Sequence, residues 1–391
     1  MRTINVYKGL ALAAVLLVAL SQCTPDDDPV KTPGDLLAYP YNPEPYNIVK
    51  PDHFPAIEVP ADNPMTQAGV QLGRRLFYDP ILSGDSTMSC ASCHFPEISF
   101  TDAKAVSTGI DGIAGRRSAM SLLNIAYVKA GLFWDGRAKT LEDQALLPVE
   151  DPIELHTSWV NVVDKLKKHP EYPKLFRAAF GIEDRSEMTK ELAAKAMAQF
   201  ERILISSGNS KYDRFKFKGE TWLFDDDEID GFAMFFEESV NLNLNLPDAQ
   251  CFHCHGGITM TGNVYFSNGL DAVNSFQDYT DKGRGLIVND STKNGLFRSP
   301  TLRNIALTAP YMHDGRFQTL EQVLDHYGNH GKSRVPYQDV LIEQVGFPIA
   351  GSNPLKYTTL TTSHKNKIIK FLHTLTDTSF VNNPDIQNPF K

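Results

Sequence analysis

The sequence predicts a mainly α-helical protein built from two related domains, and three observations lead to this fold class. The pattern Cys-x-x-Cys-His occurs twice, at residues 90–94 and 251–255. A stretch with the apolar spacing of a helix precedes each copy. Short sequences after the two copies recur in the same order, which indicates an internal repeat. A chain of 391 residues has room for two domains of ordinary size and an extension.

The composition is typical of a folded globular protein. Hydrophobic residues make up 42% and charged residues 22% of the chain. The formal net charge of -9 argues against nucleic acid as a partner.

The N-terminus predicts an exported protein. Arg2 and Lys8 precede an apolar run over residues 9–20, and residues 1–22 have the layout of an export signal that is too short to be a good membrane span. Cys23 follows where a bacterial lipoprotein signal places its acylated cysteine, although Gln22 is larger than the residue usual there. The alternative is an ordinary cleaved signal with an incidental Cys23. We expect location in the periplasm or cell envelope, with membrane contact only through an N-terminal lipid.

Residues 23–64 are rich in Pro, Asp, Asn and Tyr and predict a spacer, which need not be ordered. The next residues, 65–78, place Val70, Leu72, Leu76 and Phe77 on one helical stripe. A helix is therefore expected just before the first cysteine pair.

The second half repeats this arrangement. Three acidic residues at 225–227 favour a helix start, and apolar residues follow at helical spacing before Cys251. Both helices have Gly followed four residues later by Phe, at Gly73 and Gly231. Recurrence of common turn and cap sequences by chance is the alternative, but further matches keep the same order, namely residues 123–126 with 303–306, 135–137 with 314–316, and 140–142 with 319–321.

The repeat divides the chain into an N-terminal domain over residues 65–218 and a C-terminal domain over residues 219–391. A helix within residues 189–206 is expected to close the first domain. A helix over residues 362–375 is expected to pack on the second domain.

The two Cys-x-x-Cys-His motifs have the pattern that attaches c-type haem. Two thiols add to the porphyrin vinyl groups, and the following imidazole becomes the proximal iron ligand. The candidates are Cys90, Cys93 and His94 for one haem, and Cys251, Cys254 and His255 for the other. A zinc site or a redox dithiol is the alternative, which an export signal and two copies disfavour. A protein ligand on the second face of the iron makes an electron carrier, whereas a vacant position beside a carboxylate can split peroxide.

From about Asn63 to the C-terminus the chain resembles the bacterial diheme cytochrome c peroxidases and their MauG-like relatives. The resemblance rests on both haem motifs and on residues 133–137 and 309–316. It implies two cytochrome c-like domains, each with one covalent haem, packed around a shared interface. It also suggests a homodimer.

The resemblance assigns catalytic roles in the N-terminal domain. Trp134 matches a tryptophan between the haems that can relay electrons; its alternative is a buried aromatic anchor. Glu154 and Gln144 match residues above the N-terminal haem. Glu154 would move a proton from the inner to the outer peroxide oxygen so that water leaves, and Gln144 would hold the peroxide. Without the resemblance, Glu154 would be an ordinary helix-start carboxylate.

The chain departs from the peroxidase members at two haem positions. Asp111 stands at or beside the position of a removable histidine, which implies an open N-terminal haem. Tyr327 stands where peroxidases use a methionine and MauG-like enzymes a tyrosine as iron ligand; a phenolate would lower the potential of the C-terminal haem. Met312, His313 and His326 are competing ligands.

The resemblance also implies a calcium ion between the domains, held partly by the backbone carbonyls of Thr308 and Pro310. Ser118 replaces the asparagine that supplies a side-chain ligand in the family, and serine is the weaker ligand.

The implied activity is reduction of hydrogen peroxide to water. Electrons would come from a small cytochrome c or copper redox protein and pass through the C-terminal haem and Trp134. A MauG-like oxidase of a protein or small molecule is the alternative enzyme. A diheme electron carrier is the alternative outside enzymes, and Asp111 and Glu154 argue against it because neither is a good low-spin haem ligand.

Overall fold

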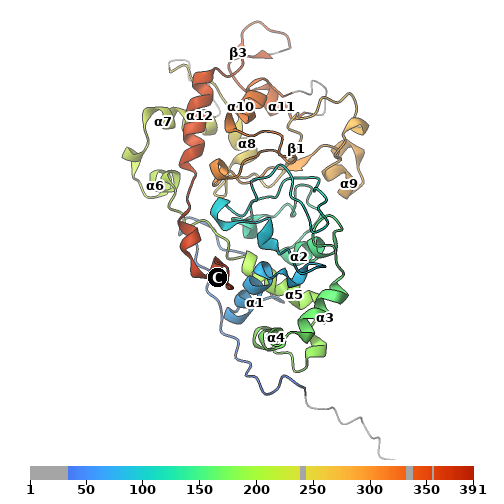
Figure 1. The fold of residues 1–391 in the computed structure, drawn as a ribbon. Helices are drawn as coiled ribbons and strands as arrows, with labels where there is room; N and C mark the ends of the chain where they lie inside the picture. The colour runs from blue at the N-terminus through green and yellow to red at the C-terminus, as the bar shows by residue number, and fades with distance from the viewer. Residues whose placement is uncertain (1–33, 238–243, 332–337, 355) are drawn as a thin grey trace, which may run out of the picture.

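The computed structural model describes residues 34–237, 244–331, 338–354 and 356–391 (Figure 1). The predicted signal at residues 1–22, Cys23 and the first part of the spacer lie outside these residues. Within them, β strands are confined to two short antiparallel pairs, β1 (Tyr265–Phe266) with β2 (Phe297–Arg298) and β3 (Pro348–Ile349) with β4 (Lys356–Tyr357), and isolated β-bridges occur in the loops. The mainly helical prediction is confirmed. No helix in the described part of the chain has the length and apolar character needed to cross a bilayer.

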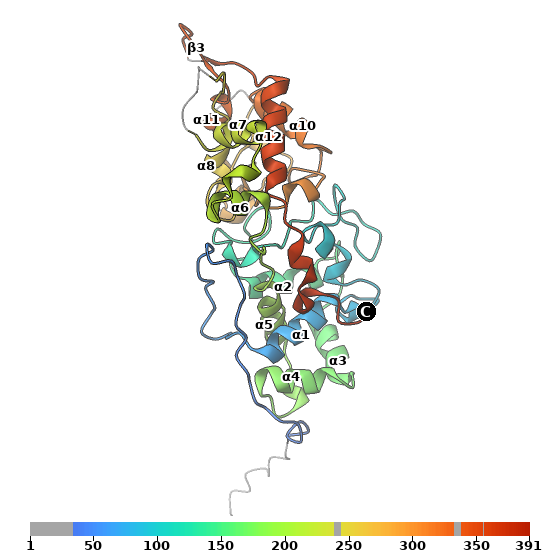
Figure 2. The ribbon, with the colours of Figure 1, turned by 90° about the vertical axis from the view of Figure 1, so that its left-hand side faces the viewer.

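The helices gather at two ends of the molecule, with long loops between them (Figures 1 and 2). One end contains α1 (Gln67–Tyr78), α2 (Leu141–Glu150), α3 (Trp159–Lys168), α4 (Tyr172–Phe180) and α5 (Lys190–Glu201). The other contains α6 (Lys211–Phe217), α7 (Asp226–Phe236), α8 (Cys251–His255), α9 (Arg284–Val288), α10 (Leu320–Gly328), α11 (Val340–Glu343) and α12 (Thr362–Thr374).

Each half is built around a closely crossing helix pair, α1 with α5 and α7 with α12. The predicted helix before each haem motif is therefore present, and α12 packs on the second half as expected. A Cβ atom on Gly73 would lie 1.9 Å from the carbonyl oxygen of Ala196, and one on Gly231 would lie 2.1 Å from that of Lys367. The repeated glycines allow two helix backbones to touch.

An asparagine that recurs in the repeat bonds to the chain just after α5 in the first half and just after α12 in the second half. Asn124 and Asn304 both adopt left-handed backbone conformations, with φ of 64° and 61°. The backbone N–H of Asn124 donates to the carbonyl of Leu204 at 2.7 Å, and that of Asn304 donates to Leu375 at 3.2 Å. The helix α5 ends at Glu201, before the predicted limit at residue 206, because the hydrogen bond from Asn124 holds the backbone of Leu204 outside the helix.

The hydrophobic packing of the two halves does not divide the chain at residue 219. Tyr212 of α6 lies in the core of the second half. After α12 the chain returns to the first half, where Phe380 and Ile386 pack with Val70 and other core residues. The hydroxyl of Tyr78 donates to the carbonyl of Ile386 at 2.6 Å. The C-terminal tail thus crosses back over the predicted boundary.

The described part of the predicted spacer, residues 34–64, is packed on both halves. Leu36 is 1% exposed in the first core. Farther on, His53 stacks on Phe217 and bonds to Asp213 at 3.2 Å, and the guanidinium of Arg303 lies over the ring of Phe54. Buried apolar and aromatic side chains thus hold this segment against the body.

The two glycine crossings predict matched losses of stability. Gly73→Ala and Gly231→Ala should each lower the free energy of unfolding by about 1–3 kcal/mol, because an added methyl group must push the paired helices apart. The midpoints of urea unfolding of the purified haem-loaded protein measure this loss. Lys190→Ala, on the exposed surface of α5, is the control and should change little. Glycine variants as stable as the Lys190→Ala control would contradict a close contact of the helix backbones at Gly73 and Gly231.

Candidate haem sites

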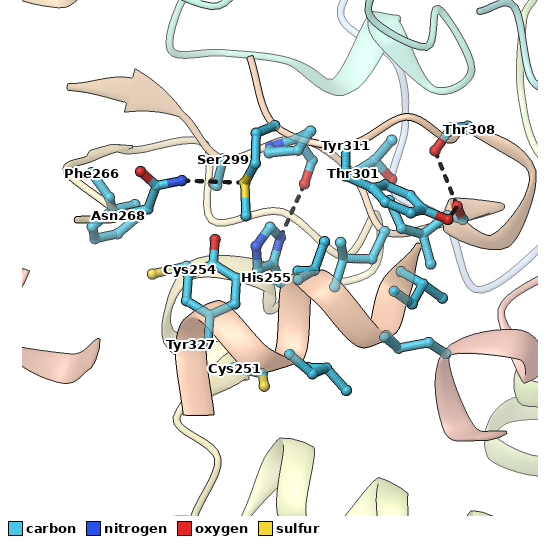
Figure 3. A pocket seen from close by; sticks show the side chains of 18 of the residues that line it. Cys251, Cys254, His255, Phe266, Asn268, Ser299, Thr301, Thr308, Tyr311 and Tyr327 are labelled. Carbon is cyan, nitrogen blue, oxygen red and sulfur yellow. Dashed lines mark hydrogen bonds between the residues drawn. The ribbon is translucent and has the colours of Figure 1, made fainter. Parts of the chain in front are cut away.

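The second Cys-x-x-Cys-His motif borders a large cavity (Figure 3). Cys251, Cys254 and His255 lie on α8 in its wall, and most other lining residues are apolar, including Phe235, Leu302, Ile305, Leu320, Leu324, Ile368 and Leu372. Nδ1 of His255 donates to the carbonyl of Pro300 at 3.1 Å. Burial lowers the pKa of His255 to about 4. A neutral imidazole with Nδ1 occupied has Nε2 left for iron.

Two candidate ligands from other elements reach the same cavity. Tyr327 of α10 and Met312 both line it. The amide of Asn268 lies 3.3 Å from the sulfur of Met312. Burial raises the pKa of Tyr327, and a hydrogen bond with Asn268 acts in the opposite direction. Asn268 thus interacts with both candidates.

The other two sequence candidates have different contacts. His326 donates from Nε2 to the carbonyl of Asn268 at 2.8 Å. The ring of His313 stacks on Phe297 with centroids 3.7 Å apart. These contacts favour Tyr327 and Met312 as the ligand candidates of the second haem.

A buried arginine fits a cavity that receives a haem. Arg298 is 3% exposed and lines the cavity. Burial lowers its pKa to about 10, and among the described residues no carboxylate lies within ion-pair distance of it. An uncompensated buried cation is costly, and the propionates of a haem carry the missing negative charge.

The first motif holds its histidine in the same way. Nδ1 of His94 donates to the carbonyl of Phe100 at 2.7 Å, and burial lowers the pKa of His94. Burial, followed by the nearby carboxylates of Glu201 and Glu154, raises the pKa of the Cys90 thiol to about 12. The described residues contain no group of three or more His, Cys, Asp or Glu side chains suited to a metal ion.

Glu154 lies in the turn between α2 and α3, beside this first motif. Its carboxylate is close enough to raise the pKa of both Cys90 and Cys93. Burial raises the pKa of Glu154 itself, Asp151 adds to the effect, and Arg137 opposes it. A buried carboxyl with a raised pKa is suited to accepting and returning a proton. Gln144 lies on α2, half-buried.

Trp134 lies at the junction of the two halves. Its Nε1 donates to the carbonyl of Ser118 at 3.0 Å, and its own carbonyl accepts from the N–H of Arg298 at 2.8 Å. The indole also lines the cavity of the second motif. Trp134 is therefore tied to both halves by its side chain and its backbone.

Comparison with known proteins settles the family. Methylamine utilization protein MauG of Methylorubrum extorquens is 36% identical over 277 residues, covering 70% of this chain and 72% of that protein. This chain belongs to the di-haem cytochrome c peroxidase and MauG family. Residues 67–221 match the family description "Di-haem cytochrome c peroxidase".

Relatives of both kinds are similar to this chain. Cytochrome c551 peroxidase of Nitrosomonas europaea is 31% identical over 306 residues, covering 77% of this chain and 85% of that protein. A solved structure of a MauG-like protein associated with microbial copper homeostasis is 33% identical, covers 88% of this chain and 100% of its own, and has a TM-score of 0.74. The predicted family, the cytochrome c domains and the two covalent haems are confirmed, and the chain is a peroxidase-family oxidoreductase.

Several residues of this di-haem protein were missed by the sequence reasoning. Arg298 had a signal in the repeat, because Arg117-Ser118 and Arg298-Ser299 both precede an Asn-Ile-Ala sequence. Glu201 had none; burial raises its pKa to about 8, and its buried Oε2 has no hydrogen-bond partner among the described residues. Asn268 also lacked a signal, because its contacts come from residues far along the chain.

The calcium site stays a prediction. Thr308 and Pro310 border the cavity of the second motif, while the hydroxyl of Ser118 donates to the carbonyl of Met312 at 3.0 Å. The serine side chain thus already has a partner in the protein.

The second haem site generates a test of its iron ligand. Tyr327→Phe should raise the reduction potential of the C-terminal haem and change its ferric resonance spectrum, because a phenolate stabilises ferric iron. Potentiometric titration with electron paramagnetic resonance measures both. Met312→Leu is the control in the same cavity and should leave both unchanged. A lower potential in Met312→Leu combined with no change in Tyr327→Phe would identify Met312 as the ligand.

Proposed function

We propose that this protein reduces hydrogen peroxide to two waters, taking up two electrons and two protons. The N-terminal haem site is catalytic, and the C-terminal site receives the electrons. The observation that carries this proposal is the buried carboxyl of Glu154 beside the first Cys-x-x-Cys-His motif. It supports a peroxide site because cleavage of the O–O bond needs a group that moves a proton.

The proposed roles follow from the chain's own groups. Cys90 and Cys93 would attach the haem and His94 would be its proximal ligand; the bound haem would supply the iron at which peroxide is reduced. Glu154 accepts a proton from the inner oxygen of peroxide and delivers it to the outer oxygen, which leaves as water. Gln144 holds the peroxide by hydrogen bonding.

The second site supplies electrons in this proposal. Cys251 and Cys254 would attach the second haem, and His255 and Tyr327 would be its iron ligands. Trp134 relays electrons between the sites, which its position against both halves supports. The donor is a small cytochrome c or copper redox protein of the periplasm or cell envelope, where a lipid on Cys23 tethers the enzyme. A homodimer and a bound calcium ion are part of the proposal.

A MauG-like oxidase of a protein or small molecule is the second candidate. Tyr327 in the cavity of the second motif favours it, because a phenolate ligand weakens a high-potential electron entry. The sequence also has no histidine between His94 and His156. Fast reaction with peroxide combined with poor turnover of reduced cytochrome or copper donors would favour this candidate.

Replacement of the proposed proton carrier tests the catalytic site. Glu154→Gln should slow the reaction of the ferric protein with peroxide by about 10²–10⁴-fold, because the amide cannot accept the proton. Stopped-flow absorption measures the rate, and resonance spectra of the resting protein report the spin state of each haem. Glu150→Gln, on the exposed end of α2, is a matched control. Two low-spin haems indifferent to peroxide in the parent would instead identify an electron carrier.

The pH dependence of the same rate reports the protonation of Glu154. Its pKa is raised by burial, and the ionised form accepts the proton, so the rate is full above this pKa and falls as the pH drops through it. The fall should start at a higher pH than the ordinary glutamate value of about 4.3. Rate measurements across the acid range should show this limb in the parent but not in Glu154→Gln. A fall of the rate at acid pH in both the parent and Glu154→Gln would report the protonation of a different residue.

A further inference from the structure

A hairpin borders the first haem site, and we call residues 107–115 the 107–115 hairpin. Thr108 and Ala114 form an antiparallel bridge, and the N–H of Gly115 donates to the carbonyl of Ser107 at 2.7 Å. At its base, the hydroxyl of Ser107 donates to the carboxylate of Asp102 at 2.7 Å. The hairpin therefore begins near Cys93, on whose pKa both Ser107 and Asp102 act.

The turn that carries Glu154, residues 151–157, is the second part, and we call it the acid turn. The N–H groups of Glu154 and His156 donate to the carbonyl of Asp151 at 3.0 and 3.1 Å. These internal bonds fix the shape of the turn. The carbonyls of Glu154 and Leu155 bond to other segments.

The tip of the hairpin docks on the acid turn. The N–H of Ile110 donates to the carbonyl of Glu154 at 3.0 Å. A Cβ atom on Gly109 would lie 2.3 Å from the carbonyl oxygen of Ile153, so the two backbones touch. The carboxylate of Asp111 and Nδ1 of His156 are hydrogen-bonded across this contact.

A third segment holds the acid turn from another direction. The N–H of Gly84 donates to the carbonyl of Leu155 at 2.8 Å. The ammonium group of Lys165 in turn bonds to the carbonyl of Ser83 at 2.6 Å and to that of Gly84 at 3.2 Å. With this side fixed, the position of the acid turn depends on how firmly the hairpin closes on it.

We infer that Asp111 and His156 are positioning residues that clamp the hairpin onto the acid turn and so hold Glu154 in place for peroxide cleavage. The inference rests on the proposed function for its kinetic consequence. Both residues act through the backbone of residues 153–156, where the N–H of Ile110 donates to the carbonyl of Glu154.

The exposure of the pair separates positioning from stability. The side chains of Asp111 and His156 are 43% and 53% exposed, and exposed ion pairs add little to stability. A catalytic group, however, can lose about 10²-fold in rate when it is misplaced by 1 Å. Loss of the pair should therefore affect the reaction much more than the fold.

A double-mutant cycle tests the inference. Asp111→Ala removes the acceptor, and His156→Gly removes the ring at a residue whose φ of 41° glycine adopts without strain. Each single variant should slow the peroxide reaction by about 10-fold or more, up to about 10²-fold. The double variant should be no slower than the slower single variant, because both changes break one contact. Unfolding midpoints should stay close to that of the parent.

Two further variants separate positioning from a general structural effect. His156→Asn keeps a donor at the place of Nδ1 and tolerates the positive φ, so it should recover most of the parent rate. Asp164→Ala with Lys168→Ala removes another exposed pair of the same half, 2.7 Å long, and should leave the rate unchanged. Single variants as fast as the parent, or losses that multiply in the double variant, would overturn the inference.

Hydrogen exchange keeps this test distinct from that of the proposed function. Amides of residues 151–157 should exchange faster in Asp111→Ala and in His156→Gly than in the parent, whatever the reaction of the protein with peroxide. Unchanged amide exchange in both variants would overturn the inference that Asp111 and His156 hold the hairpin on the acid turn. Slow peroxide reaction in Glu154→Gln combined with full rates in the pair variants would overturn it while supporting the proposed function.

Discussion

The close crossing of two helix backbones in each half is the constraint on which the haem sites depend. Gly73 and Gly231 leave no room for a side chain between α1 and α5 or between α7 and α12. One turn later the helices project Phe77 and Phe235. Phe77 lies near His94, with ring centroids 6.5 Å apart, and Phe235 lines the cavity of the second motif. Each helix crossing thus places one phenylalanine beside a Cys-x-x-Cys-His motif.

The two halves share one arrangement of helices but have chemically different sites, because the equivalent helices α2 and α10 carry different residues at the same position. Thr140 and Thr319 cap α2 and α10 through equivalent capping boxes. Eight residues after each threonine stand Pro148 and Tyr327. Proline has no atom that can bind iron, whereas tyrosine offers a phenolate. In the first half the carbonyl of Pro148 instead accepts a hydrogen bond from Leu155, next to Glu154. The duplicated frame therefore supports an acid turn in one half and a candidate ligand in the other.

The sequence could predict what depends on local pattern. The haem motifs, α1, α7, α12 and the repeat all follow from spacing and caps within short stretches of chain. Contacts between distant segments carry no such pattern. The pairing of Asp111 with His156, the contacts of Asn268 and the return of Phe380 to the first core each join residues that nothing local connects. The packing of residues 34–64 was missed for the same reason, since a few buried side chains outweigh a polar, proline-rich composition.

The junction between the halves couples haem binding to assembly. Arg298 donates its backbone N–H to Trp134, while its guanidinium is buried without a carboxylate among the described residues. Nearby, Arg117 bonds to Asp135 at 2.6 Å and to Asp281 at 2.7 Å, so this second arginine is fully compensated within the protein. A buried cation that lacks such compensation disfavours the closed junction. A haem in the adjoining cavity would supply negative charge through its propionates, and Arg298 would then link haem binding to the segment that positions Trp134.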